Sequence, residues 1–206
     1  MTAVPSWAAA WRRTERVLQQ IAAFLVDAVA GFFVYLLLAR FLFQWLRVPF
    51  RNVLGEFIIA VTNWMVMPAR RVIPALLGLD LASLLLAWLL QALSLLAIYT
   101  IGGWDFGSAP GIAAGILAGL ALLDLVRVAL YIFLFALVVM VVLSWVAPHS
   151  DVAPVFDALL RPMLRPIRRF LPLLGNFDLS PLVLIIVLQV LLIPLAHLRG
   201  LASGLF

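Results

Sequence analysis

Long apolar runs alternate with shorter polar stretches along the chain, and this pattern predicts four membrane-spanning helices. A helix needs about 20 mainly apolar residues to cross a hydrocarbon core of about 30 Å. The first run ends at Trp45 and Arg47, which are residue types that anchor helices at the headgroup level. We therefore expect an all-α integral membrane protein. The predicted spans cover residues 24–46, 81–101, 127–146 and 181–197.

Two further stretches have the polar and apolar sides of helices that lie in the membrane interface. In residues 1–20, tryptophan, valine and leucine oppose arginine, glutamate and glutamine, and residues 52–66 show a similar pattern. Residues 48–80 as a whole contain too many prolines and charges to cross the membrane. We expect an interfacial amphipathic helix in each stretch.

Residues 110–146 need a separate interpretation, because one helix of this length would measure about 55 Å at 1.5 Å per residue. Asp124 and Arg127 mark the point where we expect the spanning part to begin. Residues 102–123 would then form a glycine-rich connector and a half-helix; an extension of the third span and a fifth crossing are the alternatives. A ridge of small residues in this segment permits close helix approach. It comprises Gly111, Gly115 and Gly119.

Two basic segments have similar sequences. Residues 67–83 read MPARRVIPALLGLDLAS, and residues 165–181 read RPIRRFLPLLGNFDLSP. Their matching residues are all separated by 98 positions, which predicts an internal duplication. The expected units are residues 21–101 and 124–199, each a helix–hinge–helix repeat, followed by a tail at residues 200–206. The matching pairs are Pro68 with Pro166, Arg70 with Arg168, Arg71 with Arg169, Pro74 with Pro172, Asp80 with Asp178 and Gln91 with Gln189.

Composition strengthens the membrane assignment. Of the 206 residues, 67% are hydrophobic and 11% are charged, with a mean hydropathy of +1.21, whereas soluble domains carry about 25% charged residues. All 14 basic residues are arginine, and the net charge is +5. No basic run is long enough to follow a nucleic-acid backbone. The absence of cysteine excludes disulfides and thiolate chemistry.

The arginines also favour one topology. Eight of them flank the two hinges, five lie at the opposite ends of the spans, Arg199 among them, and Arg40 lies within the first span. The positive-inside rule therefore favours cytoplasmic hinges, four spans and parallel repeats. A fifth crossing would instead place the hinges on opposite faces and make the repeats inverted, as in many transporters.

The hinges are the first candidate binding site. Their prolines restrict the backbone and their guanidinium groups suit anionic lipid headgroups or an acidic partner. Simple positive-inside anchoring is the alternative. The hinge residues are Arg70, Arg71, Pro74, Arg165, Arg168, Arg169 and Pro172.

Polar residues inside the spans form a second candidate set, because such residues are costly in hydrocarbon unless they have partners. Asp27 and Arg127 lie 100 positions apart and can pair across the repeats, although a local pair of Asp124 with Arg127 is the alternative. Arg40 lies close enough to the hinge side to extend to the interface. Gln91 and Gln189 either line a polar path or hydrogen-bond between helices.

Capping residues are expected where the second helix of each repeat begins. Asp80, Ser83, Asp178 and Ser180 are suited to this role. No nucleophile–base pattern or dinucleotide fingerprint occurs, and His149 and His197 do not form a metal motif. We therefore expect no enzymatic activity and no cofactor.

The paired hinge segments resemble the YggT family of small bacterial inner-membrane proteins, over roughly residues 21–199. The first copy departs from the pattern, with Ala82 and Ser83 where the second has Ser180 and Pro181. Chloroplast relatives include a cofactor-assembly factor for the cytochrome b6f complex. The resemblance implies a multi-pass protein of the bacterial inner membrane with a non-enzymatic role, and the roles suggested for relatives range from complex assembly to osmotic and potassium homeostasis.

Two functions follow as expectations. The first is a scaffold or assembly factor whose hinges contact membrane lipids and a membrane-protein partner or a second copy of the chain, without an open polar route. The second is a channel or transporter component in ion or osmotic balance, which needs a continuous polar lining.

Overall fold

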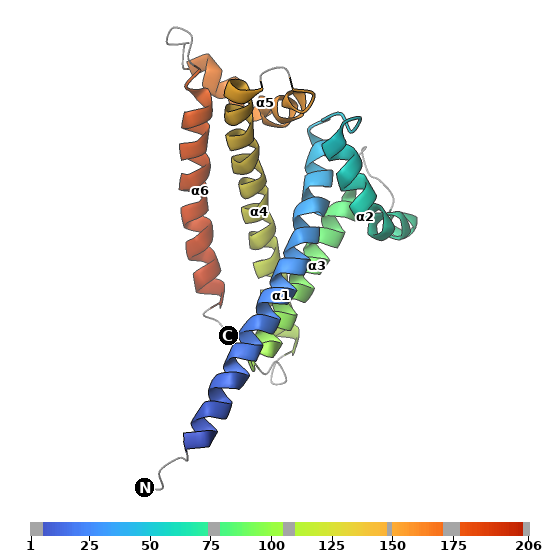
Figure 1. Cartoon of the computed structure of the whole chain (residues 1–206). Coiled ribbons are helices and arrows are strands. Elements are labelled where there is room, and N and C mark those ends of the chain that lie inside the picture. Colours follow the sequence, from blue (N-terminus) through green and yellow to red (C-terminus); the bar gives the residue numbers. More distant parts are fainter. Residues whose placement is uncertain (1–5, 74–78, 105–109, 148–149, 171–177, 204–206) are drawn as a thin grey trace.

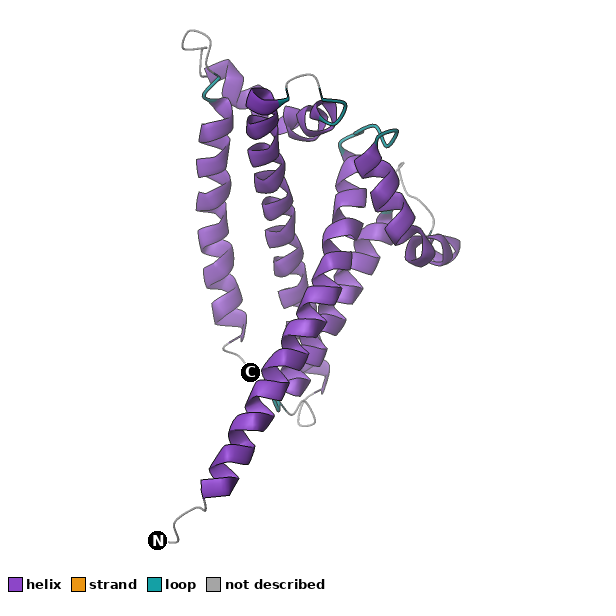
Figure 2. Cartoon of the chain, viewed as in Figure 1, coloured by secondary structure: helices purple, strands orange, loops and turns teal. Residues whose placement is uncertain are grey.

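The computed structural model describes residues 6–73, 79–104, 110–147, 150–170 and 178–203 (Figure 1). These residues form helices and connecting loops without strands, as Figure 2 shows. The all-α prediction is therefore confirmed. The helices are α1 (Ser6–Trp45), α2 (Val53–Val72), α3 (Leu81–Ile101), α4 (Pro110–Val146), α5 (Ala153–Phe170) and α6 (Ser180–Ser203).

Within the described residues, four helices are long and apolar enough to cross a membrane, which confirms the four predicted spans. These are α1, α3, α4 and α6. Large apolar side chains on their outer faces remain exposed, including Phe24 at 68%, Phe135 at 66% and Ile193 at 69%. Apolar exposure on this scale is unfavourable in water and suits contact with lipid.

The two shorter helices lie at the same end of the bundle. In Figure 1, α2 and α5 are both near the top, whereas the start of α1 and the end of α6 are near the bottom. This arrangement is the one expected of parallel halves. The alternative of a fifth crossing is not formed by residues 110–146, because α4 runs through them in a single direction.

Two helices extend beyond the predicted spans, and for residues 110–123 the structure forms the alternative of an extended third span. Residues 6–20 and the first span form one continuous helix, since arginine, glutamate and glutamine are good helix formers and no proline or glycine interrupts Ser6–Ala30. Residues 110–123 likewise continue into the third span within α4. No break is needed there, because the polar side chains of Asp124 and Arg127 have partners.

The predicted glycine ridge (Gly111, Gly115 and Gly119) is exposed, and a Cβ added at each glycine would meet no neighbouring atom within 4 Å.

The basic pairs are helical, which also differs from the predicted hinge. Arg70 and Arg71 lie in the last turn of α2, and Arg168 and Arg169 lie in the last turn of α5. Internal prolines do not stop either helix. The predicted hinge prolines Pro74 and Pro172 lie outside the described residues.

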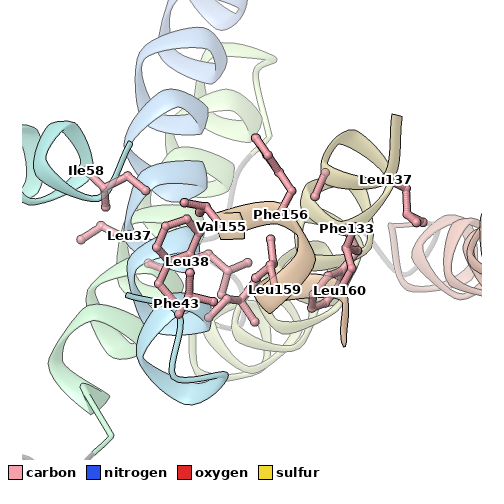
Figure 3. Packing of buried hydrophobic residues seen from close by; sticks show 14 of the residues in the cluster. Leu37, Leu38, Phe43, Ile58, Phe133, Leu137, Val155, Phe156, Leu159 and Leu160 are labelled. Atoms are coloured by element: carbon pink, nitrogen blue, oxygen red, sulfur yellow. The ribbon is translucent and has the colours of Figure 1, made fainter. Parts of the chain in front are cut away.

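Helix α5 packs its apolar side against α4 and α6 and faces α1 at the end of the bundle. Phe156, Leu159 and Leu160 point into this region from α5, as Figure 3 shows, and all are buried. Their spacing places them on one helix face, while the opposite face carries arginines. The packing fixes α5 across the bundle end and directs its basic side outward.

Candidate functional site

The carboxylate of Asp80 joins two of the helices at the bundle end. Asp80 is the N-cap of α3, and its Oδ1 accepts a hydrogen bond from the Ser83 backbone N–H at 3.4 Å. Its Oδ2 accepts one from the Ser83 hydroxyl at 2.7 Å. From the last turn of α2, Arg70 donates to both oxygens, with Nη2 to Oδ2 at 2.6 Å and Nε to Oδ1 at 3.3 Å. The carboxylate therefore links the end of α2 to the start of α3.

Arg40 adds α1 to the same network. Its Nε lies 3.4 Å from Oδ2 of Asp80, and both side chains are buried, at 6% and 1% exposed. Arg40 Nη1 donates to the Thr62 hydroxyl at 2.8 Å, and Nη2 lies 3.4 Å from the Asn63 amide oxygen. Arg40 was expected to extend to the interface, but its side chain lies in this buried network.

The surroundings of Asp80 favour its charged form. Burial by itself would raise the pKa of Asp80, but hydrogen bonds from Arg70 and Ser83, together with the charges of Arg70 and Arg40, hold that pKa below its ordinary value. Opposite charges and donated hydrogen bonds both stabilise a carboxylate. Asp80 is therefore ionised at neutral pH.

The second half contains a similar but more open pair. Arg168 Nε lies 2.9 Å from Oδ2 of Asp178, and the two side chains are 44% and 30% exposed. Oδ1 of Asp178 accepts the backbone N–H of Ser180, the first residue of α6, at 2.9 Å. Burial would raise the pKa of Asp178, but hydrogen bonds from Ser180 and the nearby Arg168 lower it. At the offset of 100 positions that separates Asp27 from Arg127, Met140 takes the place of Arg40, and among the described residues Arg168 is the one charged partner of Asp178.

All four arginines of the basic pairs are exposed, but only one in each pair forms an ion pair with a described residue. Arg70 and Arg168 bind aspartates, whereas Arg71 and Arg169 form no ion pair with any described residue. Arg165 is exposed on the polar face of α5 in the same way. These exposed guanidinium groups at one bundle end are able to bind external anions.

A polar cavity of about 530 Å³ lies between the spanning helices, away from the bundle end that carries α2 and α5. Asp124 of α4 is its best-connected residue: Arg199 Nε lies 2.8 Å from Oδ1, and Gln91 Nε2 donates to Oδ2 at 3.1 Å. Arg127 donates from Nε and Nη2 to the Tyr131 hydroxyl at 3.3 and 3.2 Å. These contacts connect α3, α4 and α6.

The cavity brings together three of the five predicted intramembrane residues and leaves out Arg40 and Gln189. Asp27, Gln91 and Arg127 line it, but the described residues contain neither the Asp27–Arg127 pair nor the Asp124–Arg127 pair. Gln91 makes an interhelical hydrogen bond, as one of its two interpretations expected. Gln189 is exposed on α6 and does not line the cavity.

Sequence reasoning missed two partners of these residues. Arg199 was counted only among the five arginines on the side opposite the hinges, although it pairs with Asp124 across 75 positions of sequence. The pairing of Arg70 with Asp80 was also missed, because each residue was given a separate role. One signal was present: the arginine and the aspartate are 10 residues apart in both segments.

The comparison with known proteins decides the family. Residues 19–101 and 119–199 match the family described as CCB3/YggT. The chain belongs to the CCB3/YggT family. Each matched segment of this YggT-family chain contains one of the two arginine–aspartate pairs.

Individual relatives match most of the chain. YggT of Escherichia coli strain K12 is 37% identical over 169 residues, covering 82% of this chain and 85% of that protein. PA0392 of Pseudomonas aeruginosa is 34% identical over 179 residues, covering 84% and 87%. A Vibrio alginolyticus protein from the proC 3′ region is 34% identical over 168 residues, covering 81% and 89%. No solved structure matches the chain significantly.

The two aspartates should differ in their contribution to stability. Asp80→Asn leaves the buried Arg40 without its counter-charge, and breaking a buried pair in this way costs about 3–5 kcal/mol. Asp178→Asn removes a partly exposed pair, which contributes about 0–1 kcal/mol. Unfolding of each variant in mild detergent measures the difference, and equal losses would contradict the role assigned to burial.

The contribution of Asp80 to the free energy of unfolding should also depend on pH. An unfolded carboxyl has a pKa of about 3.9, and the folded value of Asp80 is lower. Its stabilisation is therefore complete above about pH 5 and is lost as the pH falls through the folded value. The unfolding midpoints of wild type and Asp80→Asn should differ by a constant amount above about pH 5 and converge below about pH 4. If the difference between the two unfolding midpoints increased as the pH fell, the lowered pKa of Asp80 would be contradicted.

Proposed function

We propose that this YggT-family protein is a non-enzymatic scaffold or assembly factor for a membrane complex, with its binding surface at the basic ends of α2 and α5. The observation that carries the proposal is the paired arrangement of arginines. Arg70 and Arg168 are each bound by an aspartate, while the neighbouring Arg71 and Arg169 are exposed and form no ion pair with a described residue. Both helix ends lie at the same end of the bundle (Figure 1).

The ends of α2 and α5 are restrained and carry exposed guanidinium groups, and this combination suits recognition of anionic groups at fixed positions. The bound arginine and the packing of α5 restrict where each helix ends, so the neighbouring arginine is partly pre-organised. Guanidinium groups form bidentate bonds with carboxylates and phosphates. The proposed ligands are therefore anionic lipid headgroups and an acidic surface on a membrane-protein partner, which in a homo-oligomer would be a second copy of the chain.

The proposal includes a location and an evolutionary origin. We place the protein in the bacterial inner membrane with α2 and α5 on the cytoplasmic face, because most of the arginines flank these helices. The matching arginine–aspartate spacing in the two halves supports an origin by internal duplication.

A channel or transporter component in ion or osmotic balance is the second candidate, because the polar cavity lies among the spanning helices. Along α1 the lining of that cavity ends at Tyr35. The next turn contains Leu37 and Leu38, which are buried in the apolar core (Figure 3). This apolar layer and the outward position of Gln189 favour the scaffold.

Photocrosslinking in native membranes tests the scaffold. With photoreactive residues at positions 71 and 169, we expect both to capture the same membrane protein, because both helix ends contribute to one surface. Replacing Arg165 with glutamine should lower the yield from position 169, since it removes one exposed cation from α5. Mass spectrometry of the crosslinked products measures the capture.

A photoreactive residue at position 197 is the matched control. His197 is exposed on α6, near the opposite end of the bundle, and should not capture the same protein. Capture of lipid alone at positions 71 and 169 would contradict the scaffold. Ion flux through liposomes containing wild type or Gln91→Leu would then test the channel.

A further inference from the structure

Two neighbouring cavities lie along the seam between α1 and α4. The polar cavity described above and a second, apolar cavity share Tyr35 and Tyr131 in their linings. The apolar cavity has a volume of about 610 Å³ and is lined by residues of α1, α2, α4 and α5. Because both tyrosines contribute to both cavities, one ligand can contact the two together.

The apolar cavity is open on one side. Its floor is buried and includes Ile58, Phe156 and Leu159, which Figure 3 shows between the helices. Its rim is exposed, with Phe135 at 66% and Tyr35 at 40%. An apolar cavity with an exposed rim on a membrane-spanning surface is accessible to hydrocarbon chains from the bilayer.

The two cavities together extend along α1 over a distance suited to a phospholipid, with the headgroup at Asp27 and an acyl chain reaching toward Phe43. Asp27 in the polar cavity and Phe43 in the apolar cavity are 16 residues apart on α1, which corresponds to about 24 Å. Asp27 also lies 18 residues before Trp45, or about 27 Å along the helix. Because the hydrocarbon core is about 30 Å thick, Asp27 lies near the membrane boundary opposite α2 and α5, where a headgroup belongs.

The charges of the polar cavity favour a particular headgroup. Asp124 is neutralised by Arg199, whereas Arg127 contacts the hydroxyl of Tyr131 and its ring. Among the described residues, Arg127 has no carboxylate partner and Asp27 has no cationic partner. The cavity therefore offers one cation and one anion, each without an ion-pair partner among the described residues, at the depth where a lipid headgroup lies.

We propose that the α1–α4 seam binds one phospholipid with a zwitterionic ethanolamine headgroup, taken from the leaflet opposite α2 and α5. The lipid phosphate binds the guanidinium of Arg127, and the primary ammonium donates hydrogen bonds to Asp27. An acyl chain occupies the apolar cavity. An anionic headgroup would leave Asp27 unpaired, and a choline headgroup has no N–H to donate.

Native mass spectrometry of the full chain with added phosphatidylethanolamine, phosphatidylcholine or phosphatidylglycerol tests the assignment. Wild type should bind phosphatidylethanolamine most tightly, with one molecule per chain. Asp27→Asn should weaken its binding about tenfold, because a hydrogen bond to a charged group is worth that much, and should remove the preference over phosphatidylcholine. Arg127→Gln should weaken all three phospholipids, because each contains the phosphate.

Gln189→Leu is the control, because this exposed residue lines neither cavity; it should bind like wild type. Asp27 is itself exposed, so Asp27→Asn remains informative if Arg127→Gln unfolds. Equal wild-type binding of the three lipids, or an unchanged preference in Asp27→Asn, would overturn the proposal. Lipid binding in the cavities can be tested separately from the proposed scaffold function. Replacement of Arg71 and Arg169 by glutamine should leave this lipid bound.

Discussion

A charge removed from water must have a partner, and this constraint accounts for much of the bundle. Asp80 is nearly inaccessible, yet it is bound by Arg70 and by the buried Arg40. One carboxylate thereby satisfies two cations and connects α1, α2 and α3. The same rule applies to the polar cavity, where Asp124 is bound by Arg199 and Gln91. Each network ties together helices that are distant in sequence.

The two halves meet the constraint in different ways. In the first half, buried ionic contacts hold α2 against α1 and α3. In the second half, Arg168 and Asp178 remain partly exposed, and apolar side chains such as Leu159 and Leu160 hold α5 (Figure 3). Both solutions leave an exposed arginine beside a bound one. Equivalent surfaces can therefore be supported by different interiors.

Hydropathy alone was sufficient to predict the four spans, because lipid imposes a length and a polarity on each helix. The positions of Asp80 at a helix start and of Gln91 at a helix contact also followed from local patterns. The continuity of α1 and α4 did not, because polar residues that find tertiary partners need not interrupt a helix. Pairs such as Asp124 with Arg199 depend on how distant helices pack, and local periodicity carries no information about that packing.

The central claim is that α2 and α5 present their arginines on one face of the membrane. The chain contains no cysteine, so single cysteines at positions 14, 71 and 169 can be labelled with an impermeant maleimide in membrane vesicles of defined orientation. The account predicts that positions 71 and 169 react from the same side and position 14 from the other. Reaction of positions 71 and 169 from opposite sides would contradict it, because the two halves would then be inverted.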